Sequence, residues 1–99
     1  MRESEIEAKL RDRIRAAGGM CLKWESPGYV GVPDRMILMP GGYICFAELK
    51  TYGKKERPRQ EYVQKQLRQL GFEVFSTVDS LSKVDEVVKR CREMATQAR

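Results

Sequence analysis

Three side chains able to do active-site chemistry lie near the middle of the 99-residue chain. Asp34 ends the segment Gly-Val-Pro-Asp, and Glu48 and Lys50 end the apolar segment Phe-Ala-Glu-Leu-Lys. Because successive side chains of a strand point to opposite faces, Glu48 and Lys50 are expected on the same face. The turn Pro-Gly-Gly between the two segments predicts a hairpin, in which the start of the first strand lies across from the end of the second. The carboxylates of Asp34 and Glu48 are therefore expected to converge beside Lys50.

A divalent cation would stabilise two carboxylates at one point, because they otherwise repel each other and Lys50 offsets that repulsion only in part. Oxygen ligands favour Mg²⁺ or Mn²⁺, which keep several waters and bind one or two protein carboxylates together with substrate phosphate oxygens. Such a cation activates water and stabilises charge on a phosphodiester. A salt bridge also explains the spacing: Glu48 would pair with Lys50 or Arg35 at the sheet rim, and Asp34 would be a turn residue. Spacing alone leaves both interpretations open.

The residue types present exclude several other chemistries. The chain has no histidine, which excludes histidine-based acid–base catalysis, Ser-His triads and zinc sites that contain histidine. Its three cysteines are odd in number and widely spaced, which argues against a disulfide framework and for a reducing compartment. The N-terminal segment lacks the features of a signal peptide, and the longest apolar runs are too short to cross a membrane. We therefore expect a cytoplasmic protein without membrane contact.

The charge distribution predicts a nucleic-acid partner. The net charge is +5, and the segment that follows the two acids is strongly basic, with Glu56 as its one acid. The cationic side chains of this segment are Lys54, Lys55, Arg57 and Arg59. They are candidates for phosphate contacts, and a solvated basic loop is the alternative. Trp24 and Tyr29, in or beside the preceding loop, would either stack on an unpaired base or pack into the protein.

The remaining residues must supply the elements that position these side chains. In chain order, periodicity, turn residues and capping residues predict a helix over 3–17, strands over 20–24, 34–39 and 43–49, a helix over 58–70, a strand over 72–77 and a helix over 80–94. The second helix is expected to face inward with Tyr62, Val63, Leu67 and Leu70. Residues 95–99 are expected to be a frayed tail. The order α-β-β-β-α-β-α predicts one α/β domain over residues 1–99, with a single mixed sheet flanked by helices.

These segments together resemble the VRR-NUC branch of the PD-(D/E)XK nuclease superfamily, particularly its small stand-alone phage domains. The match runs through ESEIEAKL in the first helix, LKWESPGYVGVPDR, the PGG turn, FAELK, GKKERPRQ and LGFEV. Each matching segment is short, but their occurrence together in this order is specific. Together they cover most of the chain. The resemblance implies a restriction-endonuclease-like core and a nuclease that works in a bacterial or phage-infected cell.

The resemblance implies a role for each matching position. Asp34 and Glu48 would ligate the metal together with the backbone carbonyl of Leu49, and Lys50 would be the catalytic lysine. Gln60 matches the family's motif glutamine and would contact the active site or the substrate. An exposed residue at a helix start is the alternative for Gln60.

The family also has a first-helix glutamate that reaches the metal through a water molecule. Glu3 fits the family's register better, and Glu7 is the second candidate. For both, the alternative is a solvated acid near the helix N-terminus, where the helix dipole favours negative charge.

The residues and the resemblance together predict a Mg²⁺- or Mn²⁺-dependent deoxyribonuclease that acts on branched DNA such as four-way junctions. A twofold homodimer is expected, because symmetric resolution of a junction needs two related incisions and one small domain holds a single active site. Two alternatives are a non-catalytic DNA-binding module and a sequence-specific restriction-type endonuclease. The presence of Asp34, Glu48 and Lys50 argues against the first. The short chain, which leaves no room for a separate recognition domain, argues against the second.

Overall fold

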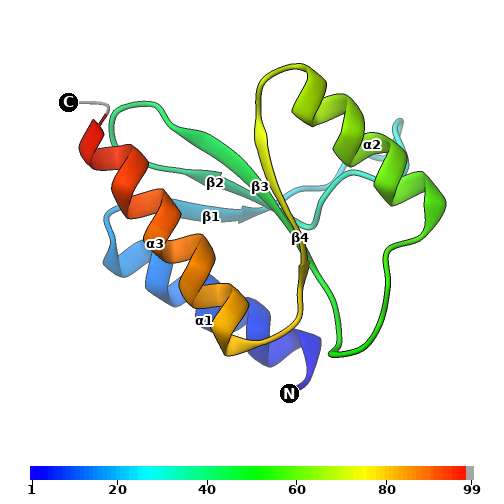
Figure 1. Ribbon diagram of the computed structural model, residues 1–99, viewed down its shortest axis with the longest axis horizontal. Coiled ribbons are helices and arrows are strands. Elements are labelled where there is room, and N and C mark those ends of the chain that lie inside the picture. Colours follow the sequence, from blue (N-terminus) through cyan, green and yellow to red (C-terminus); the bar gives the residue numbers. More distant parts are fainter. Residues whose placement is uncertain (98–99) are drawn as a thin grey trace.

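The computed structural model describes residues 1–97, which form three helices and four strands in the predicted order (Figure 1). These are α1 (Glu3–Ala16), β1 (Met20–Lys23), β2 (Arg35–Leu38), β3 (Ile44–Leu49), α2 (Pro58–Gln69), β4 (Glu73–Val78) and α3 (Leu81–Gln97). α3 continues past its predicted end at residue 94 because Ala95 still packs against the core. Residues 98 and 99 of the predicted tail lie outside the described residues. No helix in the described part of the chain is long and apolar enough to cross a membrane.

The strands form one mixed sheet in the order β1-β2-β3-β4. The pairs β1/β2 and β2/β3 are antiparallel, whereas β3/β4 is parallel and is connected through α2. In the β2–β3 turn the Met39 amide donates to the Tyr43 carbonyl at 2.9 Å, and Gly41 and Gly42 take the positive φ values of this tight connection. The predicted hairpin and the single mixed sheet are therefore confirmed.

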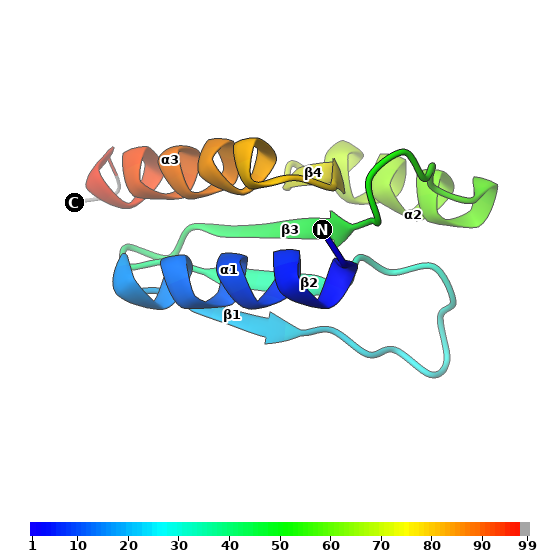
Figure 2. The same ribbon diagram turned by 90° about the horizontal axis from the view of Figure 1, so that it is seen from below.

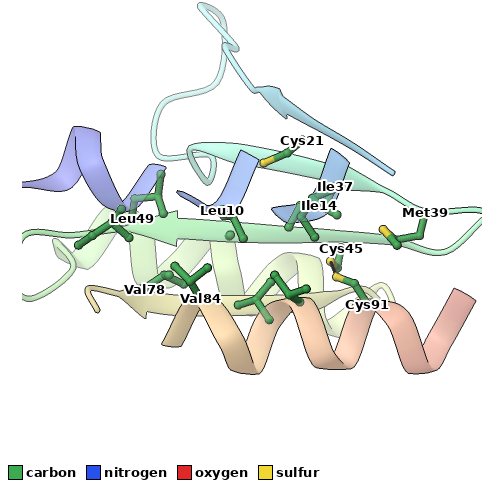
Figure 3. Packing of buried hydrophobic residues seen from close by; sticks show 14 residues of the cluster. Leu10, Ile14, Cys21, Ile37, Met39, Cys45, Leu49, Val78, Val84 and Cys91 are labelled. Carbon is green, nitrogen blue, oxygen red and sulfur yellow. Dashed lines mark hydrogen bonds between the residues drawn. The ribbon is translucent and has the colours of Figure 1, made fainter. Parts of the chain in front are cut away.

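One face of the sheet is covered by α1 and α3, which lie side by side (Figure 2). β3 turns Cys45, Ala47 and Leu49 toward these helices. The other core residues are Ile6, Leu10 and Ile14 of α1, Val84, Val87, Val88 and Cys91 of α3, and Cys21, Ile37, Met39 and Val78 of the sheet side (Figure 3). All three cysteines are buried and free, so they contribute apolar packing rather than a disulfide framework.

α2 packs away from this core, against β4 and the β1–β2 loop. Val63 and Gln64 are buried, whereas Tyr62 and Leu70 are 52% and 74% exposed. The prediction that Tyr62 and Leu70 face inward is therefore wrong. The helix contacts a narrow part of the fold, so its buried stripe is narrower than helical periodicity suggests.

The second face of the sheet is only partly covered. Phe46 is buried there beside Trp24 and Phe72, whose ring centroids lie 4.9 and 5.5 Å from its own. The exposed apolar residues of the uncovered part are Met20, Leu22 and Ile44. This part of the face lies over β1 and the start of β3, whereas α2 packs chiefly against β4.

Candidate active site

The structure brings Asp34 and Glu48 together at one end of the sheet. Arg35 of β2 pairs with Ala47 of β3, so the antiparallel register carries Asp34 to a position opposite Glu48. The Asp34 carboxylate accepts a hydrogen bond from the Leu49 amide at 2.8 Å, which orients it toward the end of β3. The convergence expected from the hairpin is thus present.

Glu48 is buried, with 1% of its surface exposed. Burial, and then the neighbouring Asp34 carboxyl, raise the pKa of Glu48 to about 9, although Lys50 acts in the opposite direction. Its Oε1 atom has no hydrogen-bond partner among the described residues. A buried acid with an unpaired oxygen beside a second acid is unfavourable in itself and suits a bound cation.

Lys50 lies beside these acids and is held by Gln60. Its ammonium donates to the Gln60 Oε1 atom at 3.0 Å, and the Arg57 amide donates to the same oxygen at 2.9 Å. Gln60 therefore caps the start of α2 and positions Lys50, so it is more than an exposed helix-start residue. No salt bridge of Glu48 with Lys50 or Arg35 occurs among residues 1–97, so the salt-bridge interpretation does not describe the site.

The two first-helix candidates have different surroundings. Glu7 accepts from the Arg35 guanidinium at 3.0 Å, and Arg35 also donates to the Cys21 carbonyl at 3.1 Å. Glu3 lies within electrostatic reach of the site: partial burial and then Asp34 raise its pKa, while Lys50 lowers it. Glu7 is thus committed to an ion pair with Arg35, whereas Glu3 is largely exposed and makes no ion pair among the described residues.

Sequence reasoning missed an anchor that fixes the basic segment. The Glu56 carboxylate accepts hydrogen bonds from the Thr77 amide at 2.5 Å and from the Thr77 hydroxyl at 2.6 Å. Thr77 has a positive φ of 53°, and the β3/β4 register shifts beside it, between Ala47 and Leu49. This irregularity turns the Thr77 donors toward Glu56. The one acid in an otherwise basic run was the available signal.

The predicted phosphate-binding residues lie on an exposed segment next to the site. Lys54, Lys55 and Arg57 are exposed and make no salt bridge among the described residues. Arg59 is also exposed, but its Nε atom donates to the Val30 carbonyl at 2.8 Å, so it holds the β1–β2 loop as well. The segment therefore presents cations within a short distance of Lys50.

The acids alone do not form a complete metal cage. Across residues 1–97, no three Asp, Glu, His or Cys side chains lie close enough to hold a metal ion by themselves. The described groups fit a hard cation that keeps waters and takes further ligands from a phosphate, because Asp34 and Glu48 supply two carboxylates. The Glu48 Oε1 atom is a buried oxygen at this point without a hydrogen-bond partner among the described residues.

Comparisons with known proteins identify the family of the chain. Models of known protein families gave no match. The chain is 42% identical over 75 residues to "Putative nuclease p44" of Acyrthosiphon pisum secondary endosymbiont phage 1, covering 76% of this chain and 81% of that protein. A solved structure described as a VRR_NUC domain superimposes with a TM-score of 0.81 and 30% identity, covering 88% of this chain and 94% of that one. The chain therefore belongs to the VRR-NUC family, a nuclease branch of the PD-(D/E)XK superfamily.

Proposed function

We propose that this VRR-NUC nuclease is a Mg²⁺- or Mn²⁺-dependent deoxyribonuclease that prefers branched DNA. The observation that carries the metal dependence is the buried Glu48 carboxyl, whose Oε1 atom is unpaired beside Asp34. Such an arrangement is costly without a compensating cation. Oxygen ligands in this number select Mg²⁺ or Mn²⁺.

Each site residue has a distinct task in this proposal. Asp34, Glu48 and the backbone carbonyl of Leu49 would hold the cation, and Glu3 would reach it through a water molecule. When bound, the cation lowers the pKa of water and stabilises charge on the phosphodiester. The Lys50 ammonium has three donors and uses one on Gln60, which leaves others for the attacking water or the substrate phosphate.

The basic segment would grip the DNA backbone beside this site. Neutralising Lys54, Lys55 and Arg57 together should weaken binding to every DNA sequence and lower the slope of log affinity against log salt by up to about 0.9 per lost contact. Neutralising Lys89, an exposed cation on α3, serves as the matched control. An unchanged salt slope would show that the segment is only a solvated loop.

The proposed assembly is a twofold homodimer, which supplies two active sites for paired incisions. Its support is the uncovered sheet face, where Met20 and Leu22 are 55% and 41% exposed beside the partly exposed Ile44. Contiguous exposed apolar residues commonly mark interaction surfaces. Light scattering that shows a monomer at micromolar concentration would contradict the dimer.

One experiment tests the activity and the substrate. Labelled four-way junctions, flaps, forks and linear duplexes are incubated with the protein in Mg²⁺, Mn²⁺ or EDTA. We expect metal-dependent nicks at symmetry-related positions of the junction and little cutting of linear duplex. Cutting that persists in EDTA would overturn the metal mechanism, and equal cutting of linear duplex would remove the preference for branched DNA.

A further inference from the structure

An apolar cavity lies between the β1–β2 loop and α2. Its volume is about 340 Å³, at the small end of the range for small-molecule sites. Trp24, Tyr29 and Val32 form the loop wall, and Val63, Leu67 and Leu70 form the helix wall. The lining, which comes from residues 24–70, includes no charged side chain. The cavity therefore suits one flat apolar ring system rather than an ion.

The loop wall is held in place by contacts with α2. The Tyr29 hydroxyl donates to the Gln66 Oε1 atom at 2.5 Å, and the Arg59 Nε atom donates to the Val30 carbonyl. Gly31 has a φ of 97°, and a Cβ atom there would lie 2.8 Å from the Arg59 side chain. The close approach requires glycine and shows that the loop is packed on the helix, so the cavity is preformed.

The sheet places one wall of the cavity near the candidate active site. The Trp24 amide donates to the Asp34 carbonyl at 2.9 Å, which continues the β1/β2 pairing by one residue. Trp24, Asp34 and Glu48 therefore occupy one row across three strands, with their side chains on the same face. Neighbouring strands are about 5 Å apart, so the wall of the cavity begins one strand away from Asp34.

A cation stands at the rim of the cavity. The Arg59 guanidinium carbon lies 4.7 Å from the ring centroid of Tyr29 and 5.2 Å from that of Tyr62. Arg59 is exposed, and it is the last cation of the basic segment that leads away from Lys50. An apolar slot with a positive rim complements a nucleotide, which joins a flat base to a phosphate.

We propose that this cavity binds an unpaired nucleobase adjacent to the phosphate that the active site cleaves. The inference rests on the proposed function and extends it to the substrate. A base in a continuous duplex is stacked on both sides and cannot enter, so the cavity selects DNA that already carries an unstacked nucleotide, as at a branch point. Trp24 and Tyr29 supply the aromatic surface on which such a base stacks.

The test uses Trp24 as a built-in reporter, because it is the single tryptophan of the chain. The Glu48→Gln protein, which should not cut, is mixed in Ca²⁺ with a branched DNA that has one unpaired thymine at the branch. The matched DNA carries an abasic residue at that position. We expect the thymine DNA to quench Trp24 fluorescence and to bind about 10-fold more tightly than the abasic DNA. Equal binding and equal fluorescence would overturn the inference.

Two variants sharpen the result. Ser26 also lines the cavity, so Ser26→Phe should fill it and reduce binding of the thymine DNA to the abasic level, whereas Ser82→Phe on α3 should keep the preference. If Ser26→Phe does not fold, Leu70→Gln removes an exposed apolar wall and should weaken the preference. Preference retained in the folded filling variant would overturn the inference.

Failure of base binding in the cavity can be distinguished from failure of the proposed nuclease function. Absence of metal-dependent cleavage on every DNA would refute the nuclease mechanism, whereas the fluorescence comparison is made without cleavage. Trp24 quenching that grows with protein concentration in the absence of DNA, and that Ser26→Phe abolishes, would show that a second copy fills the cavity, and would overturn the base-binding role.

Discussion

The two faces of the sheet receive alternate residues of the same strand and differ in what surrounds them. On the face under α1 and α3, β3 buries Cys45, Ala47 and Leu49 among apolar side chains. On the other face it buries Phe46 and then Glu48, a carboxyl with an unpaired oxygen. β3 therefore contributes core residues on one face and an active-site carboxyl on the other. The alternation of its side chains keeps these two groups on opposite faces of the sheet.

The two faces also differ in how completely helices cover them. Two helices close the first face, whereas α2 covers the second in part and leaves Met20 and Leu22 exposed. A fully covered face excludes water and substrate, so it can only pack. Asp34 and Glu48 lie on the partly open face, so we expect the substrate to approach from this side. A substitution on the open face should therefore lower cleavage and leave stability nearly unchanged. A substitution on the covered face should lower stability and leave cleavage per folded molecule nearly unchanged.

The largest effect is expected for Glu48→Gln. Loss of partners in the outer shell of a metal site costs about 10–100-fold, so loss of a direct ligand should lower cleavage by more than about 100-fold. The free energy of unfolding near neutral pH should stay the same or rise, because an unfavourable buried acid becomes a neutral amide. Cleavage assays and urea unfolding measure the two quantities. Normal cleavage by this variant would refute the metal-ligand role.

The opposite pattern is expected for Leu10→Ala on the covered face. Leu10 is fully buried, so its truncation should lower the free energy of unfolding by about 2–5 kcal/mol. Cleavage per folded molecule should be retained, because Leu10 packs on the covered face, opposite to the face that carries Asp34 and Glu48. Leu81→Ala is the matched control, since Leu81 is 37% exposed and should cost less. Equal losses of stability in the two variants would contradict the assignment of the core.

The two glutamates of α1 extend the comparison within one helix. Glu3→Gln should reduce cleavage about 10–100-fold with little change in stability, as expected for a group that acts on the metal through water. Glu7→Gln removes the partner of the buried Arg35 and should lower the free energy of unfolding by about 1–3 kcal/mol. If Glu7→Gln lowered cleavage and Glu3→Gln lowered only stability, the metal role would belong to Glu7.

The last prediction concerns the pH dependence of the metal-free protein. Glu48 has a pKa of about 9 in the folded protein against 4.5 as its reference value, so between these values the folded state holds a proton that the unfolded state has lost. Its contribution to stability is therefore full below about pH 4.5 and declines as the pH rises toward 9. Thermal unfolding in EDTA should show this decline in the natural protein and a smaller one in Glu48→Gln. Identical pH profiles would refute the raised pKa.

Local patterns in the sequence were sufficient for the elements and for the central pair of acids. Strand alternation and a tight glycine turn place Asp34 opposite Glu48, and helical spacing puts Ile6, Leu10 and Ile14 on one face of α1, where the structure buries them. These features depend on residues close together in the chain, whose geometry is set by backbone conformation. The resemblance added Gln60, which local patterns left as an ordinary helix-start residue.

Only the tertiary structure decided between residues whose local patterns are alike. Glu3 and Glu7 occupy the same helix face, and the strand that α1 meets provides Arg35 as a partner for Glu7, whereas Glu3 stays exposed within electrostatic reach of Asp34. The exposure of Tyr62 likewise depends on where α2 lies rather than on its periodicity. In both cases the deciding partner is distant in sequence and reaches the residue through packing of whole elements. A pattern within one helix carries no information about which partner it will meet.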